Sequence, residues 1–532
     1  MTLRVSPPPG FSTTVLLCAD LESCGSGLDL SEVSGALRET VPAVQVQVVP
    51  DLCAHPRRIT RVFKSDGTAR LVLGVCSRLY PRAELQTALR KAGLDPVGVE
   101  VVDLGTSAAR AHSRPVATEK AGVLLSAAVA RAGLFAGSRP ENLKPVLSAA
   151  PSRWSLLNLS LLEYQTIPAV APERCRVGEG CQYCVGLCPQ GALRVEDGEI
   201  RLEKSRCTGC GVCFSGCPHD AMDFPGYAPA QLAAQVAALL DESGEEPRAI
   251  LFVSSDSARL LDALAERETT YPPHWMPVEV PCLEMVPPAW LLACLHVGAS
   301  AVGVLPCTAE CGCGGSGRVA DRVNYCRRLL FRLGRGEDEV ILLPHDPEAL
   351  GEALRSVSLR CRPPRQGAVS APFQHRARAQ VVLQLASGHV GLEEVSLEHP
   401  ASPFGTVDLT SGCTFCGACA AVCPTGSLLL QGDGGLALTF DAALCTACGQ
   451  CVPVCPEPGV LDLRRVTELE RLARGRTVLV RDQYRRCVAC GEPIAPGAML
   501  WRITRLLEAD HPVTAGLISR YCAACRGSLS CD

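Results

Sequence analysis

A cysteine motif that occurs twice within residues 413–456 constrains this chain more than any other feature of its sequence. In each copy, three cysteines at i, i+3 and i+6 are followed, after three further residues, by a Cys-Pro pair. Three thiolates on a tight loop suit one iron–sulfur cube, whereas two structural zinc sites would show separated Cys-x2-Cys pairs. The stretch therefore predicts a pair of [4Fe–4S] clusters whose ligands are Cys413, Cys416, Cys419, Cys423, Cys445, Cys448, Cys451 and Cys455.

A less regular version of the motif lies between residues 175 and 218. Its second half has the same spacing, but in its first half Gly178 stands where a cysteine is expected, so Cys175 must reach the site through a longer loop. Both copies resemble the modules of two-cluster ferredoxins, in which the cysteine before proline binds the other cube. The resemblance implies one [4Fe–4S] cluster on Cys175, Cys181, Cys184 and Cys217, and another on Cys188, Cys207, Cys210 and Cys213.

The number and grouping of the cysteines indicate metal binding in a reducing compartment. The chain has 532 residues, enough for several domains, and its 32 cysteines fall largely in Cys-x2-Cys units, unlike those of a small secreted fold. No signal peptide is evident, and no run of about twenty apolar residues predicts a membrane span. A formal net charge of −4 argues against nucleic acid as the main ligand. We therefore expect a cytoplasmic protein.

Residues 1–137 are predicted to form a small α/β domain. Apolar runs at 14–18, 44–49, 69–75 and 97–102 alternate with stretches of helical spacing at 29–38, 82–91 and 117–132, which is typical of a parallel sheet covered by helices. The loops after parallel strands meet at one edge of the sheet. Four thiols at or near strand ends therefore either share one cluster or are buried core cysteines. They belong to Cys18, Cys24, Cys53 and Cys76.

This domain resembles the N-terminal domain of the A subunit of heterodisulfide reductase. The similar segments are Cys24-Gly25, Asp29-Leu30, Cys53, Val75–Ser77, Ala92–Leu94, Ala117–Ala121 and Ala128–Ala132. In that family the cysteines are associated with a [4Fe–4S] centre, although its first pair is more closely spaced than Cys18 and Cys24. That family continues into a flavin-binding domain with a glycine-rich motif. Residues 138–172 form a linker without such a motif, so we expect no flavin.

Residues 229–360 are predicted to form a second α/β domain, with strand-like runs at 249–253, 301–305 and 340–343. The region resembles the delta subunit of methyl-viologen-reducing hydrogenase, through Cys282, the 298–304 run, Cys307 and the arginines Arg322, Arg327 and Arg328. That family carries a [2Fe–2S] cluster and passes electrons between hydrogenase and heterodisulfide reductase. Here Ser254 and Ser257 replace its N-terminal Cys-x2-Cys pair. The resemblance implies a [2Fe–2S] cluster whose remaining ligands are Cys282, Cys307, Cys311 and Cys313.

The last part of the chain is predicted to bind a single metal ion. A bridge at 361–405 precedes the module at 406–463, and residues 464–532 contain a helix and two separated Cys-x2-Cys pairs. Paired knuckles of this kind are typical of a zinc ribbon, and a rubredoxin-like iron site is the alternative because both metals accept four thiolates. The expected ligands are Cys487, Cys490, Cys522 and Cys525.

Together these segments predict a multidomain α/β protein. Two parallel-sheet domains are interleaved with dicluster ferredoxin modules at 173–228 and 406–463, and a zinc ribbon follows. Four [4Fe–4S] clusters would carry single electrons, and no motif for a hydrolytic triad, a P-loop, a flavin or a haem is found. We expect a non-catalytic electron-transfer subunit of a hydrogenase-, formate-dehydrogenase- or heterodisulfide-reductase-like complex, with other redox subunits, such as a flavoprotein, as partners. The alternatives are an enzyme that reduces a disulfide or quinone at a cluster, and a redox-sensing or cluster-carrying scaffold.

Overall fold

The computed structural model describes residues 13–62, 70–76, 82–95, 97–147, 162–240, 247–267, 270–307, 316–357, 359, 369–389, 391–432 and 435–529. The chain divides into two compact units. The first comprises residues up to 175 together with 184–196 and 200–385, and the second comprises 176–183, 197–199 and 386–532. Among the described residues, no helix combines the length and the apolar character needed to cross a lipid bilayer.

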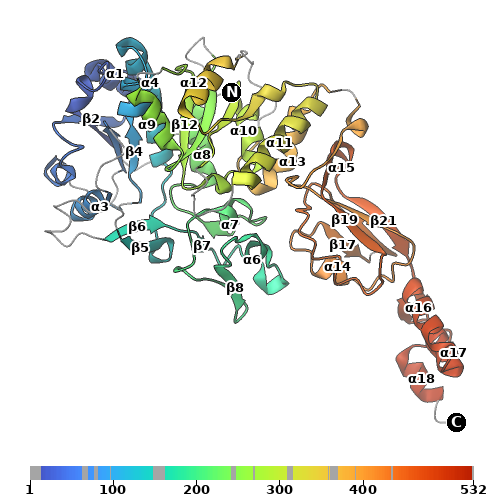
Figure 1. Ribbon diagram of the computed structural model, residues 1–532. Helices are drawn as coiled ribbons and strands as arrows, with labels where there is room; N and C mark the ends of the chain where they lie inside the picture. The colour runs from blue at the N-terminus through green and yellow to red at the C-terminus, as the bar shows by residue number, and fades with distance from the viewer. Residues whose placement is uncertain are drawn as a thin grey trace. The chain divides into compact units, whose positions relative to one another are not determined.

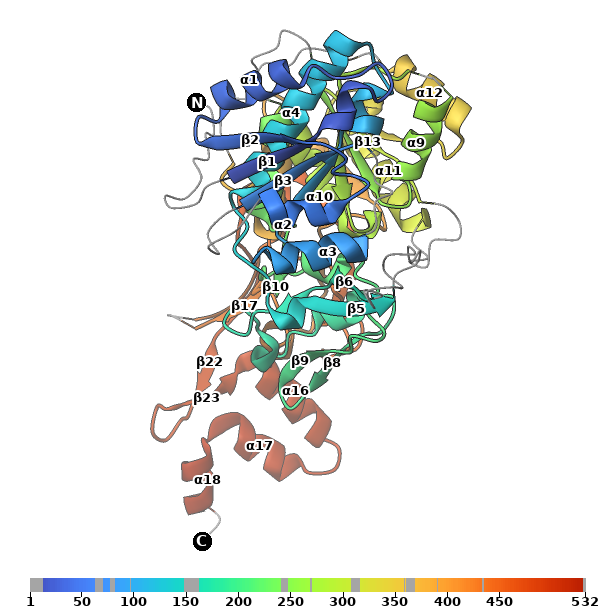
Figure 2. The same cartoon turned by 90° about the vertical axis from the view of Figure 1, so that its left-hand side faces the viewer.

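The first unit begins with the predicted parallel sheet. Its strands are β1 (Thr13–Cys18), β2 (Val44–Val49), β3 (Arg70–Val75) and β4 (Glu100–Asp103), in the order β2-β1-β3-β4, and every neighbouring pair is parallel. All six residues of β1 are buried, as expected of an inner strand with helices on both faces. Helices α1 (Leu30–Thr40) and α4 (Arg114–Ala132) lie on one side of the sheet, and α2 (Ile59–Val62) and α3 (Arg82–Lys91) on the other (Figure 2).

A second four-stranded parallel sheet follows, with the order β12-β11-β13-β14. Its strands are β11 (Ala249–Ser254), β12 (Trp275–Val280), β13 (Val302–Val304) and β14 (Val340–Leu342). The three runs that the sequence predicted as strands all form, and β12 adds a fourth. Pro277 interrupts the pattern of β12, and because β12 is an edge strand its missing N–H breaks no inner ladder.

Helices surround the second sheet and join it to the first. They are α8 (Pro229–Leu239), α9 (Ala258–Glu266), α10 (Pro288–Val297), α11 (Ser316–Arg332) and α12 (Pro347–Ser356) (Figure 1). Helix α8 packs along α4. Part of the predicted bridge also belongs to this unit: α13 (Arg378–Leu385) packs on α10, and the Trp290 indole N–H donates to the Phe373 carbonyl at 2.8 Å.

Short elements form the first ferredoxin-like module and the segment before it. Strands β5 (Leu143–Leu147) and β6 (Leu162–Thr166) pair antiparallel within the predicted linker. In the module, β7 (Ala169–Val170) pairs with β10 (Met222–Asp223), and β8 (Leu193–Glu196) pairs with β9 (Glu199–Leu202). The helices are α6 (Tyr183–Leu187) and α7 (Val212–Ser215). Little regular structure is needed here, since cysteine-rich loops supply the core.

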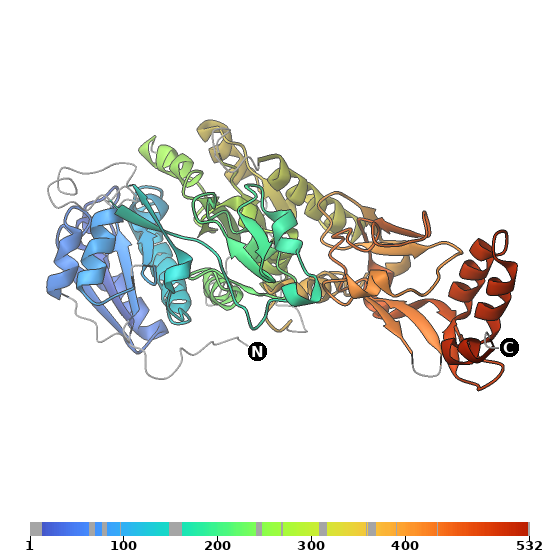
Figure 3. The same ribbon diagram turned by 90° about the horizontal axis from the view of Figure 1, so that it is seen from below.

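The second unit contains the other module and the C-terminal segment. Its strands are β15 (Ser396–Glu398), β16 (Thr406–Leu409), β17 (Leu428–Gln431), β18 (Leu436–Phe440), β19 (Leu461–Arg464), β20 (Val466–Glu468) and β21 (Thr477–Asp482), in the sheets β15-β20, β16-β19 and β17-β18-β21. Helices α14 (Ala418–Ala421) and α15 (Leu469–Arg474) accompany them. Hairpin β22 (Tyr484–Arg486)–β23 (Pro493–Pro496) then leads into α16 (Gly497–Leu507), α17 (Pro512–Arg520) and α18 (Ala523–Leu529), and α16 packs against α17 (Figure 3).

Candidate metal centres

The cysteines of residues 413–455 form two groups, and each group exchanges one member with the other copy of the motif. Cys413, Cys416 and Cys419 line one cavity together with Cys455, which belongs to the second copy. Burial, followed by the nearby thiols of Cys413, Cys416 and Cys455, raises the pKa of the Cys419 thiol to about 11. Four thiols therefore converge on one space.

Cys451 stands at the centre of the complementary group. Burial, followed in order by the neighbouring thiols of Cys445, Cys448, Cys423 and Cys419, raises the pKa of its thiol to about 12. Phe415 and Ala447, at matching positions of the two copies, both adopt the left-handed conformation, at φ 56° and 52°. The backbone N–H of Leu428 donates to the Cys423 sulfur at 3.4 Å, a contact that suits a thiolate ligand.

The first module repeats the arrangement for its more regular half. Cys188, Cys207, Cys210 and Cys213 line a common cavity. Burial holds the pKa of the Cys213 thiol well above its usual range, and Cys210, Cys184, Cys207 and Cys188 contribute to the rise. Backbone N–H groups point at the sulfurs here too: Ala192 donates to Cys188 at 3.2 Å and Gly209 to Cys207 at 3.4 Å.

The irregular half has its own loop geometry. A 3₁₀ turn at Val177–Glu179 and a left-handed Gly180 (φ 89°) take up the extra residues before Cys181. Cys181 and Cys184 are buried. Cys175 lies close enough to Cys217 to help raise the pKa of the Cys217 thiol, after burial and against the backbone N–H groups that point at it. Cys175 therefore lies near Cys217, with which it shares the predicted ligand set.

Three of the four N-terminal cysteines meet at the carboxyl edge of the first sheet. The sulfurs of Cys18, Cys53 and Cys76 all lie within 4.8 Å of one another; Cys18 ends β1, and Cys53 and Cys76 follow β2 and β3. Hydrogen bonding to Cys53 and Cys76 lowers the pKa of the Cys18 thiol to about 2, whereas hydrogen bonding to Cys18 raises that of Cys53 to about 11. Three sulfurs this close together could hold a metal ion. Cys24 is not a member of this group.

At the edge of the second sheet, two serines stand where the family resemblance places a Cys-x2-Cys pair. The Ser254 hydroxyl lies 3.1 Å from the Cys307 sulfur and 3.2 Å from the Ser257 hydroxyl. Cys282 packs instead with Cys210 and Val212. Cys311 and Cys313 lie outside the described residues.

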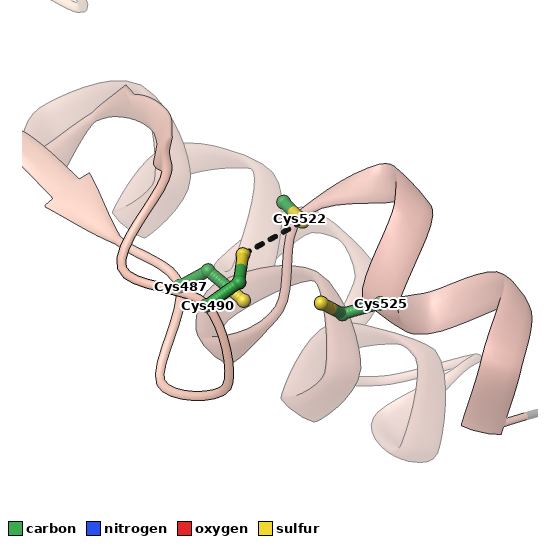
Figure 4. Close-up of side chains that lie close together, drawn as sticks. All are labelled: Cys487, Cys490, Cys522 and Cys525. Atoms are coloured by element: carbon green, nitrogen blue, oxygen red, sulfur yellow. Dashed lines mark hydrogen bonds between the residues drawn. The ribbon is translucent and has the colours of Figure 1, made fainter.

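The C-terminal cysteines come together from a hairpin and a helix. Cys487 and Cys490 lie in the β22–β23 turn, and Cys522 and Cys525 lie at the start of α18 (Figure 4). All four sulfurs are within 4.8 Å of one another, and those of Cys490 and Cys522 are 3.6 Å apart. Backbone N–H donation from Cys522, ahead of that from Cys490, lowers the pKa of the Cys487 thiol to about 6. The four thiols fit one tetrahedral ion.

A buried lysine is a feature that sequence analysis did not single out. Lys120, on α4, is 3% exposed, and its ammonium lies 3.0 Å from the His112 ring and 3.4 Å from the Tyr271 hydroxyl. Burial lowers the pKa of Lys120 to about 7. Its position on the same helix face as the buried Ala117 and Leu124, three residues before it and four after it, was the available signal, because lysine is rarely buried without a partner.

Comparison with known families confirms three of the predicted segments. Residues 249–354 match the family of the methyl-viologen-reducing hydrogenase, delta subunit. Residues 178–222 and 412–460 each match a 4Fe-4S dicluster domain. The chain thus carries two iron–sulfur dicluster domains and a delta-subunit-like domain. The resemblances proposed for residues 1–137 and 464–532 stay predictions.

Individual relatives share only a short segment with this chain. One component of the ion-translocating oxidoreductase complex of Methanosarcina acetivorans is 40% identical over 50 residues, which is 9% of this chain and 19% of the relative. Formate hydrogenlyase subunit 2 of Escherichia coli is 34% identical over 64 residues (12% and 31%). The thiosulfate reductase electron transfer subunit PhsB of Salmonella typhi is 46% identical over 44 residues (7% and 23%). The chain spans less than a third of the length of each of these relatives.

Proposed function

We propose that this chain is an iron–sulfur electron-transfer subunit of a larger oxidoreductase complex. The observation that carries the proposal is the exchange of Cys423 and Cys455 between the two groups of residues 413–455. Exchanged ligation is the arrangement of two-cluster ferredoxins, and a structural zinc site has no need of it. The dicluster matches and the relatives that are named as electron-transfer subunits support the same conclusion.

The residues present fit four cubes, because each predicted site has four cysteines. The proposed ligand sets are Cys413, Cys416, Cys419 and Cys455; Cys445, Cys448, Cys451 and Cys423; Cys207, Cys210, Cys213 and Cys188; and Cys175, Cys181, Cys184 and Cys217. When bound, a [4Fe–4S] cluster takes up and releases one electron at a time. Nine of these sixteen cysteines are buried, which limits the access of water, and backbone N–H groups point at the sulfurs of Cys188, Cys207 and Cys423. Both effects tune the reduction potential.

Three further centres belong to the proposal. Cys18, Cys53 and Cys76, with Cys24 in the following loop, would hold a fifth [4Fe–4S] cluster. Cys282, Cys307, Cys311 and Cys313 are the ligands proposed for a [2Fe–2S] cluster. Cys487, Cys490, Cys522 and Cys525 would bind zinc or, in the alternative, iron, since their sulfurs already lie within one ion's reach.

The partners are proposed to be other redox subunits. Named relatives include a formate hydrogenlyase subunit and an oxidoreductase complex subunit, and the delta-subunit family is named for a hydrogenase. We propose that a donor or acceptor of this kind docks on the delta-subunit-like domain in the cytoplasm, and that this chain relays electrons without catalysing a reaction of its own.

Anaerobic purification followed by iron analysis and a reductive titration tests the proposal. Four cubes require about 16 iron atoms per chain and about four one-electron steps, and at least about 12 iron atoms remain if one site is defective. The decisive control is the Cys448→Ala chain, which should lose about four iron atoms and part of the EPR signal of the reduced cubes. An iron content near four, accompanied by several zinc ions, would contradict the proposal.

A further inference from the structure

The delta-subunit-like domain forms one wall of a cluster site in the first ferredoxin module. Cys282 is 4% exposed and packs with Cys210 and Val212. The 3₁₀ turn η6 (Leu283–Met285) directly after it contacts α7. Met285 fills the space over Gly211: a Cβ atom on that glycine, whose φ is +73°, would lie 2.3 Å from the Met285 methyl carbon. Because Cys210 is a proposed ligand, this wall lies against the cluster site.

A charged group lies directly behind the wall. Arg322, on α11, donates to the backbone carbonyls of Glu284 and Val286 at 2.9 and 3.1 Å and to the Glu284 carboxylate at 3.1 Å. Arg318 reaches the same carboxylate oxygen at 3.2 Å. The Glu284 side chain is 2% exposed, and its second oxygen has no hydrogen-bond partner among the described residues. Three hydrogen bonds therefore hold one guanidinium against the turn that covers Gly211.

The charges in this group do not cancel. Two arginines face one buried carboxylate, which leaves a net positive charge beside the site. Burial lowers the pKa of Arg322, while Glu284 and then the thiols of Cys282 and Cys210 oppose the change, so the guanidinium lies within electrostatic range of the Cys210 sulfur. Charges interact strongly where water is excluded, and Arg318, with 48% of its side chain exposed, is screened more than Arg322.

We propose that Arg322, positioned by Glu284, raises the reduction potential of the cluster held by Cys188, Cys207, Cys210 and Cys213. Reduction adds one electron to that cluster and changes no bond. The added negative charge is stabilised by the fixed guanidinium, so this cluster is easier to reduce than it would be without Arg322. The inference rests on the proposed function, and it gives the delta-subunit-like domain a direct influence on a cluster that it does not itself ligate.

Redox titration of the anaerobically purified chain, followed by EPR, tests this role. The Cys210→Ala chain identifies the signal that belongs to the site. Arg322→Gln should lower the midpoint of that signal by at least the ~59 mV that corresponds to a tenfold change in a one-electron equilibrium. In Arg322→Lys, which keeps the charge, the midpoint should differ from that of the wild-type chain by less than half of that shift. Arg327→Gln is the matched control, because Arg327 is on the same helix but is half exposed and pairs with Glu337.

The Glu284→Gln chain separates a charge effect from a packing effect. Loss of the carboxylate leaves the arginines uncompensated, so the midpoint should rise, opposite to Arg322→Gln. An unchanged midpoint in Arg322→Gln, or shifts of the same sign in both variants, would overturn the inference while the electron-transfer function stands. If Arg322→Gln fails to retain iron, the Glu284→Gln chain decides instead: a midpoint that falls or stays unchanged in that chain overturns the inference. If Cys210→Ala removes none of the EPR signals of the wild-type chain, the proposed ligand set is contradicted, and the inference with it.

Discussion

The hydroxyl of Ser254 lies 3.1 Å from the sulfur of Cys307. Ser254 ends β11 and Cys307 follows β13, so the two side chains meet at the carboxyl edge of neighbouring strands. Ser257 completes the contact, and both serines are buried. A small polar cluster therefore occupies the edge at which the delta-subunit family resemblance places a Cys-x2-Cys pair.

Replacing both serines by cysteine should increase binding of a [2Fe–2S] cluster at this edge. Ser254→Cys puts a second thiol beside Cys307, and Ser257→Cys adds a third, which brings the site closer to the four thiolates that such a cluster prefers. We expect about two additional iron atoms per chain and a new EPR signal that persists at temperatures where [4Fe–4S] signals have broadened. Ser254→Ala with Ser257→Ala is the control, because it removes both hydroxyls without adding a thiol. Equal iron content in the two double variants would contradict the expectation.

The exchanged ligation predicts which pairs of cysteine substitutions have additive effects on the iron content. Cys423 and Cys448 belong to one group, whereas Cys416 belongs to the other. The double variant Cys423→Ala/Cys448→Ala should therefore lose about four iron atoms, and Cys423→Ala/Cys416→Ala about eight, since each cube holds four. Iron analysis distinguishes the two losses directly. The opposite result, with the larger loss in the first pair, would show that each motif copy holds its own cluster.

Prediction from the sequence was most complete where the proposed ligands lie close together along the chain. The repeated motif of residues 413–455 predicted which cysteines group together, and both parallel sheets followed from alternating apolar and helical stretches. Strand β12 was not predicted, because Pro277 interrupts its apolar pattern. The proline is tolerated because β12 is an edge strand.

Contacts between distant segments were harder to anticipate. Packing of Cys282 against Cys210 depends on how two domains meet, which no local pattern encodes. In the same way, the separation of Cys24 from Cys18, Cys53 and Cys76 depends on the loop after β1. The second C-terminal Cys-x2-Cys pair begins helix α18, a detail that the spacing of the four cysteines leaves open.

At the N-terminal centre, loss of Cys53 should release more metal than loss of Cys24. The Cys53 sulfur lies in the group with Cys18 and Cys76 and accepts the backbone N–H of Cys76 at 3.1 Å. Cys53→Ala should remove about four iron atoms per chain if a cube is present there, and Cys24→Ala fewer. Metal analysis of both chains, purified in parallel, checks the order. Equal losses would instead place Cys24 among the ligands on equal terms.

At the C-terminal centre, removal of Cys490 should release one metal ion and leave the cubes in place. Its sulfur is 3.6 Å from that of Cys522, and all four thiols fit one tetrahedral ion. Elemental analysis of Cys490→Ala should show about one zinc fewer per chain with unchanged iron. A loss of one iron with unchanged zinc would favour the rubredoxin-like alternative. A loss of about four iron atoms would contradict the single-ion site.

Lys120 should make the stability of the first unit depend on pH. Its folded pKa is about 7 because burial disfavours the ammonium, whereas an unfolded lysine titrates near ~10.4. Between these values the unfolded chain binds more protons than the folded one, so the free energy of unfolding rises with pH through this window. The groups that face Lys120 are His112, Tyr271 and His274; burial, followed by the Lys120 charge, lowers the pKa of His112 to about 3 and that of His274 to about 4, so both stay neutral in this range.

Thermal unfolding of the full holoprotein at a fixed scan rate, between pH 7 and 9, measures this dependence. The midpoint should rise with pH in the wild-type chain, and the rise should be reduced in Lys120→Met, which keeps the buried length of the side chain but removes the titrating group. Over the whole window the difference amounts to a few kcal/mol, on the order of 1.4 kcal/mol for each unit of pKa shift. Lys91→Met, at an exposed position on α3, is the matched control and should keep the wild-type slope. Identical slopes in Lys120→Met and the wild type would mean that Lys120 does not titrate in this range.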